Sequence, residues 1–142
     1  MSIAQKLQKA VIKSLSDLYN QKFTEADFQV NQTKEEFKGD YTVVLFSLLK
    51  KTGQNPAALG EQLGNALVKN EPGLFTGFNI IKGFLNLIVA DSFWLDLVHT
   101  NYANDEYGTH PLNGKKVMVE YSSPNTNKPL HLGHLRNNFL GW

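Results

Sequence analysis

The sequence has 142 residues, enough for one ordinary domain with a buried core. Hydrophobic residues make up 42% and charged residues 19% of it, which excludes a disordered, low-complexity protein. The formal net charge of +1 excludes a strong long-range field toward nucleic acid or membranes, and the absence of cysteine excludes disulfides, thiolate catalysis and the usual structural zinc sites.

The amino-terminal region predicts an amphipathic helix over about Ser2–Asn20. Apolar residues recur every three or four positions, at Ile3, Leu7, Val11, Leu15 and Leu18. Lysines at 6, 9 and 13 would face water and resemble a transit peptide, but this stretch has no arginine and contains Asp17. No run approaches the roughly 18 apolar residues of a membrane helix. We therefore expect a cytoplasmic protein with no membrane contact.

The next elements are shorter. Phe28–Asn31 alternates as a half-buried strand does. For Tyr41–Lys51 the apolar run favours a strand, but Asp40 as an N-cap and Gly53 as a stop favour a helix. We interpret the segment as a buried helix. Asn55-Pro56 then places a capping side chain before proline, which starts a helix with Leu59, Leu63, Ala66 and Leu67 on one face.

Two apolar runs, Phe78–Ile81 and Phe84–Val89, flank Lys82-Gly83 and predict an antiparallel hairpin, because glycine accepts a positive φ. Asp91 is placed to cap a further helix that extends through Val98. Residues 1–103 are thus expected to form an α+β domain with helices packed on a small antiparallel sheet.

Residues 104–114 carry the glycine, proline and polar residues of a linker. After it, Lys116–Tyr121 predicts a strand, Ser122–Pro129 a loop and His131–Trp142 the start of a helix. Residues 115–142 would then be the first strand-loop-helix of a Rossmann-type domain that is truncated in this sequence.

The stretch VEYSSPNTNKPLHLGHLRNN carries the most specific chemical signal. A helix amino terminus presents backbone N–H groups and partial positive charge, which suit a phosphate. His131 and His134 are three residues apart and share one face of the first turn, while Gly133 leaves room for a nucleotide. Lys128 adds a compact cation just upstream. The pattern predicts an ATP site.

This stretch resembles the first signature of class I aminoacyl-tRNA synthetases in the form SPNxxKPLHxGHxR of the arginyl enzymes. The resemblance implies ATP-dependent formation of arginyl-adenylate and transfer to tRNA(Arg), with Mg2+ accompanying ATP, no protein-bound metal and a monomeric parent protein. It implies catalytic and ATP-binding roles for Lys128, His131 and His134, and an ATP contact by Gly133. Ser123, Pro124, Asn125 and His134 would bind arginine.

A weaker resemblance to the amino-terminal domain of the same family rests on Gly39-Asp40-Tyr41, Pro56–Leu59 and Gly83-Phe84-Leu85-Asn86. That domain binds the D-loop at the tRNA elbow, which implies that Phe84 stacks on an unpaired base, Asn86 hydrogen-bonds its edge and Lys82 reaches a phosphate. The alternative is purely structural, with Phe84 in the core and Asn86 at a turn or strand edge. The family more often has glycine-proline or glycine-glycine before this phenylalanine.

Three other interpretations stay open. His131 and His134 have a spacing that can bind zinc. The chain can be an RNA-binding module that works alone, or part of another nucleotidylyltransferase with the same histidine motif. Because one parallel strand has no neighbours to pair with, we expect no aminoacylation by this segment alone.

Overall fold

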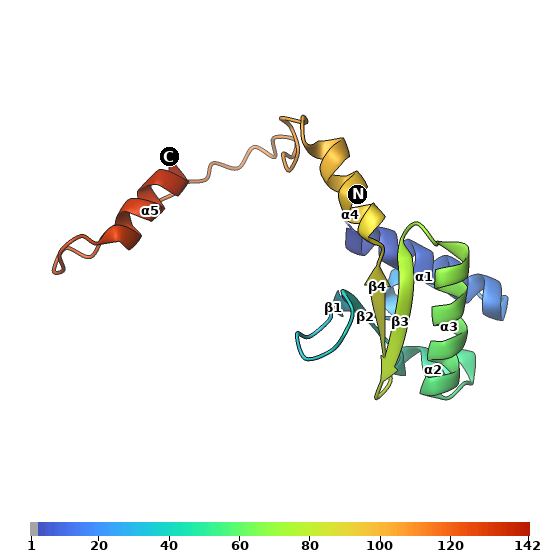
Figure 1. Cartoon of the computed structure of the whole chain (residues 1–142). Coiled ribbons are helices and arrows are strands. Elements are labelled where there is room, and N and C mark those ends of the chain that lie inside the picture. Colours follow the sequence, from blue (N-terminus) through green and yellow to red (C-terminus); the bar gives the residue numbers. More distant parts are fainter. Residues whose placement is uncertain (1–2) are drawn as a thin grey trace. The chain divides into compact units, whose positions relative to one another are not determined.

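A computed structural model describes residues 3–142 and divides the chain into two compact units, Met1–Asp105 and Glu106–Trp142. The first unit holds helices and a four-stranded antiparallel sheet (Figure 1). The predicted α+β class with a small antiparallel sheet is therefore confirmed. Within residues 3–142 no helix has the length and apolar character needed to cross a membrane.

Two long helices follow the predicted pattern. Helix α1 spans Ile3–Tyr19 and ends one residue before the predicted Asn20, whose φ is 48°. Ser2 lies outside the described residues. Helix α3 spans Pro56–Asn70 and begins as predicted: the Asn55 side-chain oxygen accepts a hydrogen bond from the Ala58 amide at 2.8 Å. This bond satisfies one of the amides that a helix start leaves unpaired.

The strands are β1 (Val30–Gln32), β2 (Tyr41–Val44), β3 (Phe75–Ile81) and β4 (Phe84–Val89), in the order β1-β2-β4-β3. The predicted hairpin between β3 and β4 is confirmed. Lys82 and Gly83 both have positive φ, 48° and 82°, as a tight hairpin turn requires. The first strand begins two residues later than predicted, because Phe28 is buried in the core instead of pairing.

The prediction of a helix over Tyr41–Lys51 was wrong for its first half. Tyr41–Val44 forms β2, paired on both sides with β1 and β4, and only then do a 3-10 turn η2 (Phe46–Leu48) and a short helix α2 (Leu49–Thr52) follow. Asp40 caps no helix; its carboxylate accepts a hydrogen bond from the Val89 amide at 2.8 Å. The strand partners come from distant sequence, so their contribution overrides the local helix signal. Gly53 does end α2, with φ 66°.

Helix α4 spans Asp91–Asn101 and is longer than predicted. Asp91 is its first residue and not its cap, because Ala90 occupies the N-cap position with extended backbone. A carboxylate in the first turn still interacts favourably with the helix dipole. Near its start, the Phe93 ring packs edge-on against Trp94 and lies 5.0 Å from the Lys6 ammonium.

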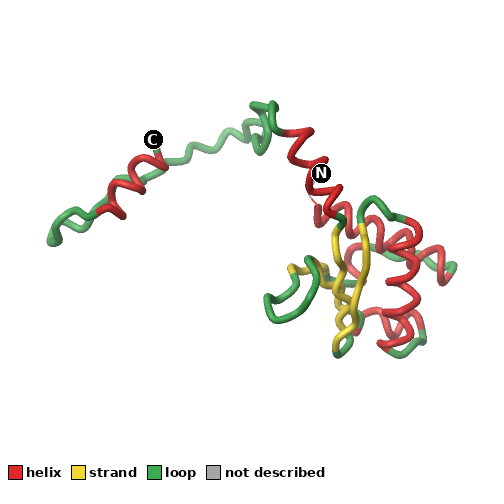
Figure 2. The backbone as a smooth tube through the Cα atoms, in the orientation of Figure 1, coloured by secondary structure: helices red, strands yellow, loops and turns green. Residues whose placement is uncertain are grey.

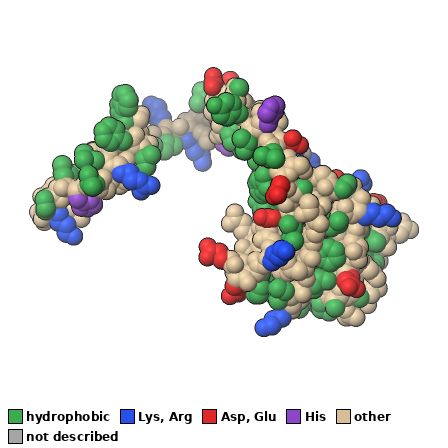
Figure 3. All heavy atoms as spheres, in the orientation of Figure 1, with side chains coloured by type: hydrophobic (Ala, Val, Ile, Leu, Met, Phe, Trp, Pro, Cys, Tyr) green, Lys and Arg blue, Asp and Glu red, His purple; other side chains and the backbone are tan. Residues whose placement is uncertain are grey.

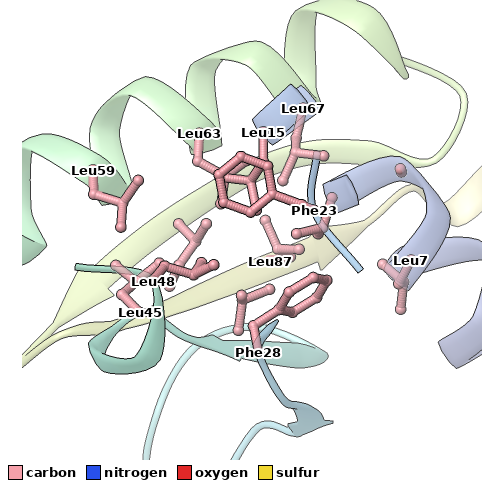
Figure 4. Packing of buried hydrophobic residues seen from close by; sticks show 14 of the residues in the cluster. Leu7, Leu15, Phe23, Phe28, Leu45, Leu48, Leu59, Leu63, Leu67 and Leu87 are labelled. Atoms are coloured by element: carbon pink, nitrogen blue, oxygen red, sulfur yellow. The ribbon is translucent and has the colours of Figure 1, made fainter. Parts of the chain in front are cut away.

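The core lies between the sheet and helices α1 and α3, which cover one of its faces (Figures 1 and 2). Figure 4 shows leucines of both helices meeting Phe23, Phe28, Leu45, Leu48 and Leu87. Gly64 brings α3 close to β3, since a Cβ there would lie 2.6 Å from the Phe78 ring. Among the described residues of the first unit, no helix packs on the opposite face of the sheet, and the loop between β1 and β2 lies over part of that face.

The second unit contains one helix, α5 (Leu132–Gly141), and otherwise loop and turn (Figure 2). The predicted loop and helix start are present, but the strand predicted over Lys116–Tyr121 is not formed among the described residues. A strand needs a neighbour for its N–H and C=O groups, and none pairs with this segment. Apolar side chains such as Val119, Leu132 and Phe139 are exposed in this unit, as the hydrophobic atoms in Figure 3 illustrate.

Candidate functional site

The first candidate site is the start of α5. His131 is the N-cap residue, and its Nδ1 accepts a hydrogen bond from the Gly133 amide at 3.1 Å. The His131 amide in turn donates to Nδ1 of His134 at 3.1 Å. The two rings lie with centroids 4.0 Å apart. The predicted pairing of these histidines at one helix start is therefore present in the structure.

These bonds determine what the imidazoles offer a ligand. A neutral imidazole carries one proton, and a ring nitrogen that accepts a hydrogen bond cannot hold it. Since both Nδ1 atoms accept, the neutral rings carry their protons on Nε2. The helix start thus presents two Nε2–H donors, while the Gly133 amide that a phosphate would otherwise bind is already paired with His131.

Gly133 lies close to the capping imidazole. A Cβ at this position would lie 2.9 Å from Cε1 of His131, closer than real side chains approach. The residue thus leaves room for the capping imidazole itself, a role the sequence interpretation did not include. The space it leaves for a nucleotide stays a prediction.

The loop before α5 is open. Ser123, Asn125 and Lys128 are exposed and Pro124 is half-buried. The Lys128 backbone amide donates to the Asn125 carbonyl at 3.4 Å and closes a turn. The Lys128 side chain is exposed. Among residues 3–142 no group of three or more histidine, aspartate or glutamate side chains is placed to bind a metal ion. The loop offers a cation and neutral hydrogen-bonding groups, which suit an anionic ligand.

The second candidate site is the uncovered face of the sheet. Alternation sends Val43, Leu85 and Leu87 into the core and their neighbours to the other face. A polar row crosses this face, with Thr42 opposite Asn86 and Asn86 opposite Asn79. A parallel apolar row places Val44 opposite Phe84 and Phe84 opposite Ile81. An apolar surface beside fixed polar groups is typical of small-molecule and base-binding sites.

A cavity of about 300 Å³ lies over these rows. The structure brings all three residues predicted to contact tRNA to its lining, where Lys82 and Phe84 are exposed and Asn86 forms part of the floor. The remaining lining comes from β1, β2, the end of β3 and the loop between β1 and β2: Asn31, Gln32, Lys34, Glu36, Phe37, Thr42, Val44 and Ile81.

The three residues are not equally accessible. Phe84 is 39% exposed, so it is not a core residue, contrary to the purely structural interpretation of its position. Asn86 is only 1% exposed, although it lines the cavity, and its amide bonds to Thr42 at 2.6 Å and to Asn79 at 2.9 Å. A base at the cavity floor would reach Asn86 only at the edge of its amide.

Phe46 was missed by the sequence interpretation. It is 50% exposed in η2, and its ring packs edge-on against Phe84 with centroids 5.7 Å apart. The two rings form one exposed aromatic surface, which favours base stacking. The sequence offered no signal for this, because Phe46 and Phe84 are brought together only by the pairing of β2 with β4.

Comparison with known proteins gives consistent results for both parts of the chain. The family described as "Arginyl tRNA synthetase N terminal domain" matches residues 5–89, and "tRNA synthetases class I (R), catalytic domain" matches residues 97–142. The chain is 45% identical to an arginine–tRNA ligase of Parabacteroides distasonis over 100% of its own length, and 47% identical to one of Bacteroides fragilis over 99%.

Among solved structures, Thermus thermophilus arginyl-tRNA synthetase is similar to 99% of the chain, with a TM-score of 0.55 and 27% sequence identity. The chain covers 22% of that structure. It spans 24% of the length of each of the two bacterial relatives, about a quarter.

Proposed function

The chain belongs to the arginyl-tRNA synthetase family, and on that basis we propose that it is part of an arginine–tRNA ligase. Such an enzyme uses ATP to convert L-arginine to arginyl-adenylate and then transfers the arginyl group to tRNA(Arg). Residues 1–103 would supply the domain that binds the tRNA elbow, residues 104–114 the linker and residues 115–142 the start of a Rossmann-type catalytic domain. The observation that carries the proposal is the succession of two family matches, to the amino-terminal domain of arginyl-tRNA synthetases and then to the class I catalytic domain.

In the proposed activation step no protein nucleophile is needed. The arginine carboxylate attacks the α-phosphorus of ATP, which enters as its Mg2+ complex, and pyrophosphate leaves. The barrier falls when the reactants are aligned and the charge on phosphorus is stabilised. The Nε2–H groups of His131 and His134 would donate to the phosphates, Lys128 would neutralise their charge and Gly133 would contact the nucleotide.

Arginine would bind to the loop before α5. We assign this role to Ser123, Pro124 and Asn125, with His134 beside them. The exposure of Ser123 and Asn125 is consistent with the assignment, since a hydroxyl and an amide in an open loop are free to meet an α-ammonium or carboxylate group.

In the proposed tRNA contact, Phe84 stacks on an unpaired base, Asn86 bonds to the edge of that base and Lys82 meets a phosphate. The shared cavity of about 300 Å³ supports this assignment. We place the full-length protein in the cytoplasm as a monomer, and sedimentation of the full-length protein tests the second point.

The decisive experiment is arginine-dependent exchange of pyrophosphate into ATP by the full-length protein, with and without tRNA(Arg). Lys128→Ala is expected to lower the exchange rate by about a hundredfold, as loss of one charge-stabilising group commonly does. Lys116→Ala is the matched control, because it removes an exposed lysine outside the loop. Exchange that requires another amino acid, or an unchanged rate in Lys128→Ala, would contradict the proposal.

The 142-residue chain itself is expected to bind tRNA(Arg) but to form no arginyl-tRNA. Phe84→Ala should weaken binding about tenfold, equivalent to one lost stacking contact. Tyr102→Ala is the control, because Tyr102 is exposed directly after α4 and does not line the cavity. Equal effects of the two variants would remove the cavity from the RNA-binding surface.

A further inference from the structure

A continuous chain of hydrogen bonds crosses the uncovered face of the sheet. The Thr33 and Thr42 hydroxyls are 2.9 Å apart, and Thr42 donates to Oδ1 of Asn86 at 2.6 Å. Nδ2 of Asn86 donates to Oδ1 of Asn79 at 2.9 Å, and Nδ2 of Asn79 donates to the Lys38 carbonyl at 2.5 Å. The chain begins and ends in the loop between β1 and β2, whose residues help line the cavity.

The Lys38 carbonyl at the end of this chain fixes the donor and the acceptor in every bond. A backbone carbonyl only accepts, so Asn79 must direct its NH2 group toward Lys38 and its oxygen toward Asn86. Asn86 must then direct its NH2 group toward Asn79 and its oxygen toward Thr42. Thr42 uses its single proton on Asn86, so the donor in the bond with Thr33 is the Thr33 hydroxyl.

Strand register holds these groups in place. Thr42, Asn86 and Asn79 are directly opposite one another on three neighbouring strands, β2, β4 and β3. The loop is held separately at its second end, where the Asp40 amide donates to the Leu87 carbonyl at 2.8 Å and the Asp40 carboxylate accepts from Val89. A 180° flip of the Asn86 amide would break two bonds at once while the rest of the site stayed fixed.

We propose that Thr42 and Asn79 are positioning residues that fix which way Asn86 presents its amide to an RNA base, and that they thereby determine the base selectivity of the cavity. The inference rests on the proposed RNA-binding role of this face. Asn86 retains one lone pair and one N–H beyond those used in the chain. Donor and acceptor are therefore presented in one fixed order, and a base with the opposite order would leave a buried polar group unpaired.

The test uses the 142-residue chain and tRNA(Arg) transcripts that differ at one unpaired D-loop base each. The measured quantity is the selectivity ratio, the largest dissociation constant among these transcripts divided by the smallest. Thr42→Val removes the hydroxyl at nearly constant volume and is expected to lower this ratio about tenfold, equivalent to about one hydrogen bond. Thr42→Ser keeps the hydroxyl and is expected to retain the wild-type ratio.

A second variant keeps the proposal testable if Thr42→Val does not fold. Asn79→Leu removes the oxygen that accepts from Nδ2 of Asn86, so the Lys38 carbonyl no longer sets the direction of the Asn86 amide. It is also expected to lower the selectivity ratio. In the full-length protein both variants should raise the KM for tRNA and leave kcat unchanged at saturating tRNA, since neither residue belongs to the nucleotide loop.

Two results would overturn the inference: a wild-type selectivity ratio in folded Thr42→Val and Asn79→Leu, or a loss of selectivity in Thr42→Ser equal to that in Thr42→Val. Failure of the underlying function is recognised separately. If Phe84→Ala and Asn86→Ala leave tRNA affinity unchanged, the cavity does not bind RNA. If they weaken binding while Thr42→Val keeps its selectivity, only the positioning role is lost.

Discussion

Gly83 illustrates how one residue determines the aromatic surface of the candidate RNA site. Its φ of 82° suits glycine, and a Cβ there would overlap the Phe46 ring that packs on Phe84. We expect Gly83→Ala to lower the free energy of unfolding by about 2 kcal/mol, because backbone strain adds to the loss of the Phe46–Phe84 contact when the half-exposed Phe46 ring moves aside. Chemical denaturation of the 142-residue chain measures this loss. Displacement of Phe46 should also weaken tRNA binding.

Gly53→Ala is the control for backbone strain alone. Its φ is 66°, yet a Cβ there would meet no atom within 4 Å. It should cost about 1 kcal/mol and leave tRNA binding unchanged. Equal losses of stability in the two variants would show that the Phe46 contact does not require glycine.

At the scale of elements, the start of α3 is stabilised by a single side chain. Asn55 accepts a hydrogen bond from the Ala58 amide, so Asn55→Ala is expected to lower the free energy of unfolding by about 1 kcal/mol. Asn65→Ala is the control, since it lies exposed within the same helix, where alanine is the better helix former. Thermal and chemical denaturation compare the two. A loss of stability in Asn65→Ala as large as that in Asn55→Ala would contradict a specific capping role.

Another link between elements depends on pH. Asp27 in the 3-10 turn η1 (Glu25–Asp27) bonds to the Lys51 ammonium of α2 at 2.8 Å and to the Thr24 amide at 2.7 Å, and these bonds lower the pKa of its carboxyl. Because the pKa of Asp27 is lower in the folded than in the unfolded protein, the ionised carboxylate stabilises the fold at pH values above the ordinary carboxyl pKa. This stabilisation is lost as the pH falls through the lowered pKa of the folded protein.

We therefore expect Asp27→Asn to have a lower free energy of unfolding than the wild type at neutral pH. In acid the two free energies of unfolding should become equal. Denaturation curves at a series of pH values measure the difference. A difference that stayed constant from neutral pH to well below the ordinary carboxyl range would exclude this linkage.

At the scale of the whole molecule, the two units differ in packing. Buried hydrophobic residues extend from Leu7 to Ala90 in the first unit, whereas residues 106–142 are exposed except for half-buried Pro124, His134 and Asn138. Limited trypsin digestion should therefore cut first after Lys115 or Lys116 and leave the first unit intact, because cleavage requires an accessible, locally unfolded backbone. Mass spectrometry identifies the order of cuts. Initial cleavage after Lys69 or Lys82 would contradict this difference.

The sequence by itself determined the features that depend on neighbouring residues. These are the amphipathic period of α1, the cap of α3 at Asn55, the hairpin turn at Lys82-Gly83 and the paired histidines at the start of α5. In each case the signal lies within a few residues of the element it specifies, so it can be read along the chain.

Only the tertiary structure decided the features that depend on distant partners. Tyr41–Val44 became a strand because β1 and β4 pair with it, and Lys116–Tyr121 did not become one because no segment within residues 3–142 pairs with it. Phe46 reached Phe84 in the same way. The orientation of the Asn86 amide follows from the Lys38 carbonyl, which lies 48 positions earlier in the chain and is connected to it through Asn79. Strand pairing and hydrogen-bond direction are properties of residues brought together by folding, and a local pattern does not contain them.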